Sequence, residues 1–107
     1  MTNKIEPLSN AQKKFLRKLG HGLSPAVYIG KEGLSETVVS AIDEALVHHE
    51  LIKIKIINTD KISKQEAADK VPELSSGQLV QLIGKTLLVY RRNKDKKRDE
   101  QIPLPKK

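Results

Sequence analysis

The segment best suited to chemistry is the glycine-bracketed turn Gly30-Lys31-Glu32-Gly33, which lies between an apolar run and a predicted helix. Glycines let the backbone approach a phosphate closely, and the free N–H groups of a first helical turn attract anions. Lys31 would add a positive charge. The alternative is a tight strand-to-helix turn that needs glycine for its geometry alone. The spacing fits neither the Walker A phosphate loop nor the G-x-G-x-x-G dinucleotide fingerprint.

A second candidate is a helix predicted over residues 10–20, after the N-cap Ser9. At about 100° per residue, its cations occupy the arc opposite its apolar residues. The apolar set is Ala11, Phe15, Leu16 and Leu19, and the cationic set is Lys13, Lys14, Arg17 and Lys18. Like charges one turn apart repel by about 0.2–0.5 kcal/mol, so a wholly cationic face favours a polyanionic partner. A solvated face is the alternative; a membrane surface is disfavoured because Trp is absent.

Further cations lie on a predicted strand, residues 51–57. Its isoleucines Ile52, Ile54 and Ile56 point one way, so Lys53 and Lys55 point to the other, wet face. These lysines are candidates for phosphate contact. They equally suit a solubilising role, or protection of an exposed sheet edge.

The net charge of +7 is unevenly distributed. Residues 91–107, from Arg91 onward, carry eight basic and three acidic side chains. Residues 11–31 carry five basic side chains and no acid, whereas residues 32–50 carry five acids and no Lys or Arg. Separated charge of this kind suits a polyanion bound on one face. Ordinary charge scatter on a solvated surface is the alternative.

Catalytic and metal-binding patterns are weak. The chain has no cysteine, which excludes disulfides, thiolate nucleophiles and Cys-ligated metals. His48 and His49 are adjacent, so on a helix their imidazoles would diverge by about 100°. Asp43-Glu44 lies on a polar helix face, and no serine stands in a G-x-S-x-G motif. We therefore predict no enzymatic activity, no cofactor and no metal.

The order of predicted elements gives the fold class. Ser35 caps a helix ending near His49, Ser63 caps a short one running to about Lys70, and Pro72 closes it. Strands are predicted over residues 26–29, 51–57, 78–83 and 86–91. Gly84-Lys85 forms a type II′ hairpin turn between the last two. The order α-β-α-β-α-β-β implies an α/β sandwich with a mixed sheet of about four strands.

A chain of 107 residues allows one domain. The core must be aliphatic because Phe15, Tyr28 and Tyr90 are the only aromatic residues, and we expect the strands to bury both tyrosines. Residues 92–107 form a basic tail whose middle, residues 93–101, is too polar to pack alone and is predicted to be mobile. It could serve as a cationic arm or simply be a disordered terminus. No apolar run is long enough to span a membrane, and residues 1–10 lack an export signal core.

Several segments in this order resemble the CRM domain (chloroplast RNA splicing and ribosome maturation) in its stand-alone bacterial YhbY-like form. The resemblance covers residues 8–91. The matching segments are Leu8-Ser-x-x-Gln-x-x-Phe-Leu-Arg17, Val27-Tyr-Ile-Gly-Lys-Glu-Gly-Leu34, Ile42-Asp-Glu-Ala-Leu46, His49-Glu-Leu-Ile-Lys-Ile54, Leu79-Val-Gln-Leu-Ile-Gly-Lys85 and Leu88-Val-Tyr-Arg91.

The resemblance implies a fold similar to the C-terminal domain of translation initiation factor three. It also implies RNA binding, in the cytoplasm, to precursors of the large ribosomal subunit. The family's G-x-x-G loop corresponds to Gly30, Lys31, Glu32 and Gly33, and its basic helix to Lys13, Lys14, Arg17 and Lys18. Glu32 departs from the uncharged or basic residue that is usual in this loop, and an acid facing a phosphate is repulsive.

Three function hypotheses follow. The first is a non-catalytic, monomeric RNA-binding module for large-subunit assembly, in which helix and loop lie on one surface together with Lys53, Lys55 and Arg91. Shape and phosphate recognition should dominate there. The second is an adaptor that docks a basic ribosomal protein on the acidic helix carrying Glu36, Asp43 and Glu44. A small-ligand or metal enzyme is a third, weaker reading.

Overall fold

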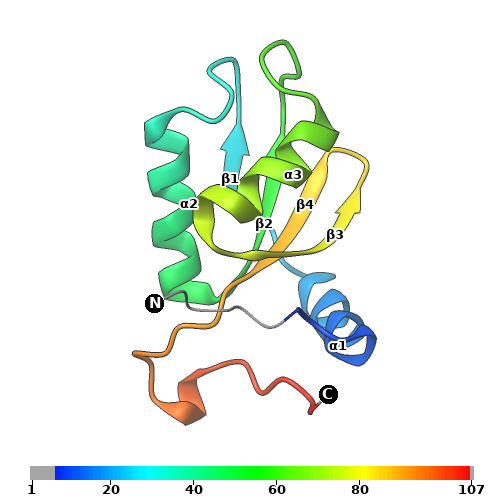
Figure 1. The fold of residues 1–107 in the computed structure, drawn as a ribbon, viewed down its shortest axis with the longest axis vertical. Helices are drawn as coiled ribbons and strands as arrows, with labels where there is room; N and C mark the ends of the chain where they lie inside the picture. The colour runs from blue at the N-terminus through cyan, green and yellow to red at the C-terminus, as the bar shows by residue number, and fades with distance from the viewer. Residues whose placement is uncertain (1–6, 107) are drawn as a thin grey trace.

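Residues 7–106, which the computed structural model describes, form three α-helices, four strands and a short 3-10 helix (Figure 1). The elements are α1 (Asn10–Gly20), β1 (Pro25–Ile29), α2 (Glu36–His49), β2 (Leu51–Ile56), α3 (Lys64–Ser75), β3 (Gln78–Ile83), β4 (Thr86–Tyr90) and η1 (Arg98–Glu100). This α-β-α-β-α-β-β order confirms the fold class predicted from the sequence.

The four strands make one mixed sheet in the order β1-β2-β4-β3. β1 and β2 are parallel and joined through α2, whereas β2–β4 and β3–β4 are antiparallel. Lys55 is the register partner of Tyr28 on one side and of Thr86 on the other, and Thr86 is in turn the partner of Ile83. These four residues form one row across the sheet.

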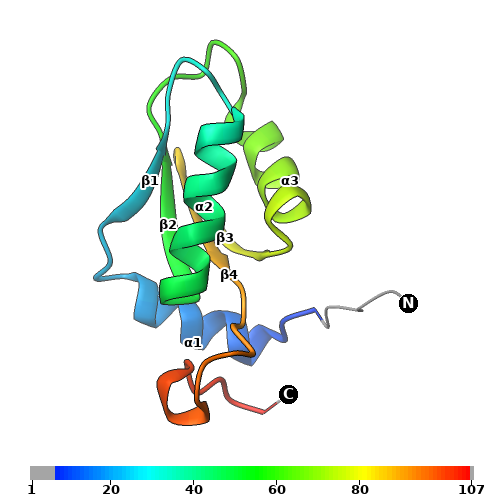
Figure 2. The same ribbon diagram turned by 90° about the vertical axis from the view of Figure 1, so that its left-hand side faces the viewer.

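Both faces of the sheet carry helices, but unequally (Figure 2). α2 and α3 cover one face, where the main core consists of aliphatic side chains such as Ile42, Ile54 and Leu87. α1 lies across one end of the other face, where Leu16 packs with Leu51, Val80, Leu88 and Tyr90. The remainder of that second face has no helix against it (Figure 2).

The buried stripe of α1 differs from the predicted one. The capping box at Ser9 is present, with Gln12 as its second member. Gln12, Leu16 and Gly20 are buried, whereas Ala11 is exposed and Leu19 is 45% exposed. A Cβ on Gly20 would lie 2.7 Å from Leu88 Cδ1, so the helix approaches β4 closely at this position. The sequence pattern assigned the buried side of the helix by hydrophobicity. It therefore did not identify Gln12 and Gly20, which are buried because the helix packs closely on the sheet there.

The third helix continues past its predicted end. Ser63 and Glu66 form a second capping box, but the helix runs to Ser75 with Pro72 inside it. Val71 and Ser75 are buried on the same side as Ala67, and Ser75 Oγ donates to the Val71 carbonyl at 2.6 Å. This packing outweighs the hydrogen bond that proline cannot donate. The hairpin turn has a positive φ at Gly84 but not at Lys85, as expected for type II′.

The polar tail lies against the body of the domain through a buried carboxylate. Glu50, which is 0% exposed, accepts the Asn93 backbone N–H at 2.8 Å and the Ile102 backbone N–H at 2.7 Å. Ile102 and Leu104 then pack against the cluster around Leu16. Neither contact is predicted by the polar sequence of the tail, and the domain boundary at residue 91 stays a prediction.

Candidate nucleic-acid interface

The part of the sheet that α1 leaves uncovered is referred to below as the open face. Strand alternation fixes its members, because the residues between them point toward α2 and α3. Tyr28 is 51% and Ile83 62% exposed, which is unusual for large apolar side chains on a sheet. The open face consists of Tyr28, Lys53, Lys55, Gln81, Ile83 and Thr86.

A shallow hollow of about 80 Å³ joins the open face to the end of α1. Arg17 and His21 line it from the helix side and Lys53 from β2, together with Gly20, Gln81, Ile83, Thr86 and Leu88. Lys53 Nζ donates to the His21 carbonyl oxygen at 3.4 Å. No acidic side chain lines this hollow. The structure therefore brings two predicted cations, Arg17 and Lys53, to one site.

The other α1 cations extend this positive surface away from the sheet. Lys14, Arg17 and Lys18 are exposed and Lys13 is half-buried. In the part of the chain that the structure describes, one ion pair is present, and it involves none of them. Their charges are consequently free to act on a ligand.

Backbone geometry explains only one of the two glycines in the Gly30–Gly33 turn. The Gly33 N–H donates to the Gly30 carbonyl at 3.1 Å, and Gly33 has φ +65. A Cβ on Gly33 would also lie 3.1 Å from Lys61 Cβ. A Cβ on Gly30, by contrast, would meet nothing nearer than Ile57 Cδ1 at 3.9 Å. The fold thus requires glycine at position 33 but not at 30, where its absence of a side chain leaves the backbone accessible.

The turn and α1 lie at opposite ends of the sheet, so they do not form one compact patch (Figures 1 and 2). The turn follows the end of β1, whereas α1 packs where β2 begins. The open face, with Lys53, Lys55 and Tyr28, lies between them and has no acidic member. Lys31 is exposed in the turn, as is Glu32 beside it.

Arg91 is directed away from the open face. Its Nη1 donates to Asp43 Oδ1 and to the Ser75 carbonyl, both at 2.7 Å, and its Nη2 donates to the Asp43 carbonyl at 3.2 Å. The guanidinium therefore joins α2 to the end of α3. The structure does not bring Arg91 together with the other predicted site residues.

Comparison with known proteins is consistent with this geometry. A model of the CRS1 / YhbY (CRM) domain matches residues 8–91. The chain belongs to the CRM domain family. An RNA-binding protein from Haemophilus influenzae is 41% identical over 94% of this chain and 97% of its own length. Probable RNA-binding protein YqeI from Bacillus subtilis is 38% identical over 92% of this chain and 99% of its own length.

A solved relative has the same fold as this CRM domain. The solution structure of the hypothetical protein SAV1595 from Staphylococcus aureus superposes with a TM-score of 0.73 at 38% identity. The match covers 92% of this chain and 99% of that one. The family and its fold are therefore established by sequence and structure together.

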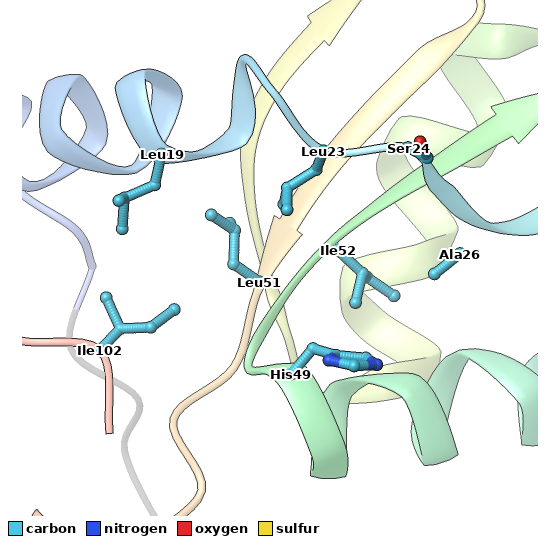
Figure 3. Close-up of a pocket in the computed structure, with 8 residues that line it drawn as sticks. All are labelled: Leu19, Leu23, Ser24, Ala26, His49, Leu51, Ile52 and Ile102. Atoms are coloured by element: carbon cyan, nitrogen blue, oxygen red, sulfur yellow. The ribbon is translucent and has the colours of Figure 1, made fainter. Parts of the chain in front are cut away.

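A second pocket of this CRM domain is apolar (Figure 3). It has a volume of about 340 Å³ and lies between the end of α1, the start of β2 and the tail. Figure 3 shows Leu19, Leu23, Leu51 and Ile102 around a common space, with the Ser24 hydroxyl turned away. His49 is the one titratable side chain in its lining. Within residues 7–106 no three His, Cys, Asp or Glu side chains form a metal-binding group.

Sequence reasoning missed one feature of the CRM domain surface, the exposure of Tyr28. The apolar run in β1 predicted burial of the whole strand, but β1 is an edge strand with one uncovered face. The expectation of burial is wrong for Tyr28 and confirmed for Tyr90, which is 4% exposed. Burial raises the pKa of Tyr90 to about 12, and the nearby Glu50 carboxylate adds to this effect. Both tyrosines lie in apolar strands, and the sequence around them does not indicate which ring is exposed.

No helix in residues 7–106 has the length and apolar character needed to cross a bilayer.

Proposed function

We propose that this protein is a non-catalytic RNA-binding module. The observation that carries the proposal is the acid-free hollow in which Arg17 of α1 and Lys53 of β2 lie together. Neighbouring cations that no described acid neutralises are mutually repulsive, and a polyanion relieves that repulsion. The RNA-binding names of the two bacterial relatives support the same reading.

The proposed contact surface runs along the sheet rather than forming one compact patch. It begins at α1, crosses the open face through Lys53 and Lys55, and reaches the Gly30–Gly33 turn. Recognition would depend on phosphates and RNA shape, because lysines and a glycine backbone carry no base code. Its proposed members are Lys13, Lys14, Arg17, Lys18, Gly30, Lys31, Gly33, Lys53 and Lys55. Arg91 is left out because its guanidinium is already bound within the fold.

Glu32 limits how the turn can contact RNA. Its side chain is exposed, and a carboxylate facing a phosphate is repulsive. We therefore expect the Gly30 side of the turn, with Lys31, to approach the RNA backbone while Glu32 points to solvent.

The biological role we propose is assembly of the large ribosomal subunit in the cytoplasm, with precursor rRNA as the ligand. The CRM family membership motivates this role. Crosslinking the full chain to RNA in cells, with both nucleotides and residues mapped, tests it directly. Crosslinks spread over unrelated RNAs would overturn the ribosomal role while leaving RNA binding intact.

Salt titration tests the electrostatic mechanism. If about five phosphates are contacted, log K should fall with log salt at a slope of roughly −3.5 to −4.5. A slope near zero would reject the mechanism. A competing adaptor role on the acidic α2 is less favoured, because the Asp43 carboxylate already pairs with Arg91. Capture of ribosomal proteins that survives nuclease treatment would favour the adaptor instead.

A further inference from the structure

We propose that Tyr28 is a stacking platform for one unpaired RNA base, with Lys55 beside it to hold a flanking phosphate. This inference rests on the proposed RNA-binding function and deepens it. It predicts that the protein prefers single-stranded or bulged RNA to a continuous duplex. Phosphate contacts alone would not create that preference.

The Tyr28 ring lies on an uncovered part of the sheet. Tyr28 lies on the edge strand β1, and no helix covers that side of the strand (Figure 2). Its side chain is 51% exposed, whereas the flanking Val27 and Ile29 are 7% and 0% exposed. Among the described residues, the ring makes no aromatic pair. About half of the Tyr28 side chain is thus open to solvent on a side of the strand that no helix covers (Figure 2).

The neighbours of Tyr28 on the sheet are cationic or polar. Lys55 is the direct register partner of Tyr28, and Thr86 follows it in the same row. Lys31 lies three residues further along the chain, in the exposed turn. An aromatic face with cations on the adjoining strand and turn suits a nucleotide, which has a planar base and an anionic phosphate. A protein partner of acidic character would satisfy the lysines but would leave the ring without a flat partner.

The geometry of an RNA duplex keeps its bases away from a ring on a sheet. Bases in an A-form helix are stacked on one another, and the deep major groove is closed to side chains. A ring on a sheet can reach only a base that is already unstacked. The Tyr28 ring would therefore contribute to binding of loops, bulges and single strands and add little to duplex binding.

The experiment combines affinity with a direct signal from the ring. The chain has two tyrosines and no tryptophan, so ¹³C-tyrosine labelling gives two sets of ring signals, and Tyr90→Phe assigns them. The ligand is a non-self-complementary RNA of about ten nucleotides, and its blunt duplex serves as the comparison. We expect the Tyr28 ring signals to move upfield with the single strand but not with the duplex.

The affinity arm uses three variants in the full chain. Tyr28→Ala should weaken single-strand binding about 5- to 150-fold and leave duplex binding nearly unchanged. Tyr28→Phe should keep the affinity because it keeps the ring. Leu74→Ala, which removes an exposed apolar side chain from α3 on the opposite side of the sheet, is the matched control and should change affinity less than about threefold.

Outcomes separate the two proposals. Salt-dependent RNA binding with an unmoved Tyr28 signal, or with full single-strand affinity in Tyr28→Ala, overturns the stacking platform alone. Failure of the wild-type protein to bind either RNA overturns the proposed function and the platform together. Equal loss in Tyr28→Ala and Leu74→Ala would mean that removing any exposed apolar side chain weakens binding, wherever it lies in the fold, and would also overturn the inference.

Discussion

Lys53 Nζ donates to the carbonyl oxygen of His21 at 3.4 Å. This contact joins the middle of β2 to the residue that follows α1, 32 positions earlier in the sequence. A carbonyl at a helix C-terminus carries partial negative charge, so it favours a cation. The contact orients the Lys53 ammonium toward the hollow that it shares with Arg17.

The α1 cations should contribute to RNA affinity without contributing to stability. We expect the variant Lys13→Gln, Lys14→Gln, Arg17→Gln and Lys18→Gln to bind RNA more weakly, with a salt slope reduced by about 3 if each cation contacts one phosphate. Its thermal midpoint should stay close to that of wild type, because the relief of two like-charge pairs one turn apart offsets the loss of Arg17 and Lys18 from the last turn of the helix. Filter binding across a salt series and thermal unfolding measure these effects. Unchanged binding would show that the helix face is not the contact.

The two lysines of the open face can be tested against a matched pair elsewhere. Lys53→Gln with Lys55→Gln should reduce the salt slope by about 1.4 to 1.8. Lys64→Gln with Lys70→Gln removes the same charge from exposed positions on α3, which covers the opposite face. The control should leave the slope close to wild type. Equal losses in both pairs would indicate that net charge, rather than a defined face, governs binding.

The two glycines of the turn should respond differently to alanine. Gly33→Ala should lower the free energy of unfolding by about 1 kcal/mol or more, because position 33 has φ +65 and Lys61 lies close. Gly30→Ala should leave stability nearly unchanged, since its Cβ would have ordinary contacts. If the Gly30 backbone approaches a phosphate, the same change should weaken RNA binding. Chemical denaturation and RNA titration of both variants separate these roles. Full RNA affinity in Gly30→Ala would show that this turn does not contact RNA.

Arg91 should act as a structural residue. Arg91→Ala should destabilise the fold by about 1–3 kcal/mol, because the charged hydrogen bond to the Ser75 carbonyl is lost. Asp43→Asn should cost less than about 1 kcal/mol, since the Asp43 side chain is 60% exposed and its pairing is screened by solvent. Under conditions in which each variant is folded, the RNA salt slope should match wild type. A reduced slope in Arg91→Ala would instead indicate that Arg91 contacts RNA.

Glu50 should hold the tail to the domain. Glu50→Ala leaves the N–H groups of Asn93 and Ile102 without their acceptor, so we expect a loss of about 2–4 kcal/mol in unfolding free energy. Hydrogen exchange at these two amides should accelerate more than exchange in β4. Glu44→Ala, which alters an exposed carboxylate on α2, is the control and should stay within about 0.5 kcal/mol of wild type. Slow exchange at both amides in Glu50→Ala would mean that the apolar contacts of Ile102 suffice to hold the tail.

The Tyr90 phenol should make stability depend on pH in the alkaline range. Its folded-state pKa is raised from 10.0 to about 12, so between these values the unfolded chain loses a proton that the folded chain keeps. The free energy of unfolding should therefore fall as pH rises from 10 to 12. Tyr90→Phe should show a shallower fall over that range. Absorbance titration of Tyr28→Phe, which isolates Tyr90, measures the pKa, and a value of 10.0 would show that the ring is not shielded from water in solution.

Local signals in the sequence determined most of the secondary structure. Ser9 and Ser63 begin their helices as predicted, because a hydroxyl followed by Gln or Glu three residues later satisfies free N–H groups within a single turn. The alternation of isoleucine and lysine also predicted the two faces of β2, because successive side chains of a strand point to opposite sides of the sheet. These patterns involve neighbours in the chain and need no knowledge of what packs against them.

Tertiary structure alone decided where the candidate surface lies. The exposure of Tyr28 depends on β1 being at the sheet edge and on α1 ending at Gly20, and neither fact is contained in the apolar run around the tyrosine. The burial of Glu50 and the engagement of Arg91 likewise depend on partners more than 40 residues away in the sequence. Periodicity reports which side of an element is apolar, but only the packed fold determines what covers that side, because coverage is set by contacts between distant segments.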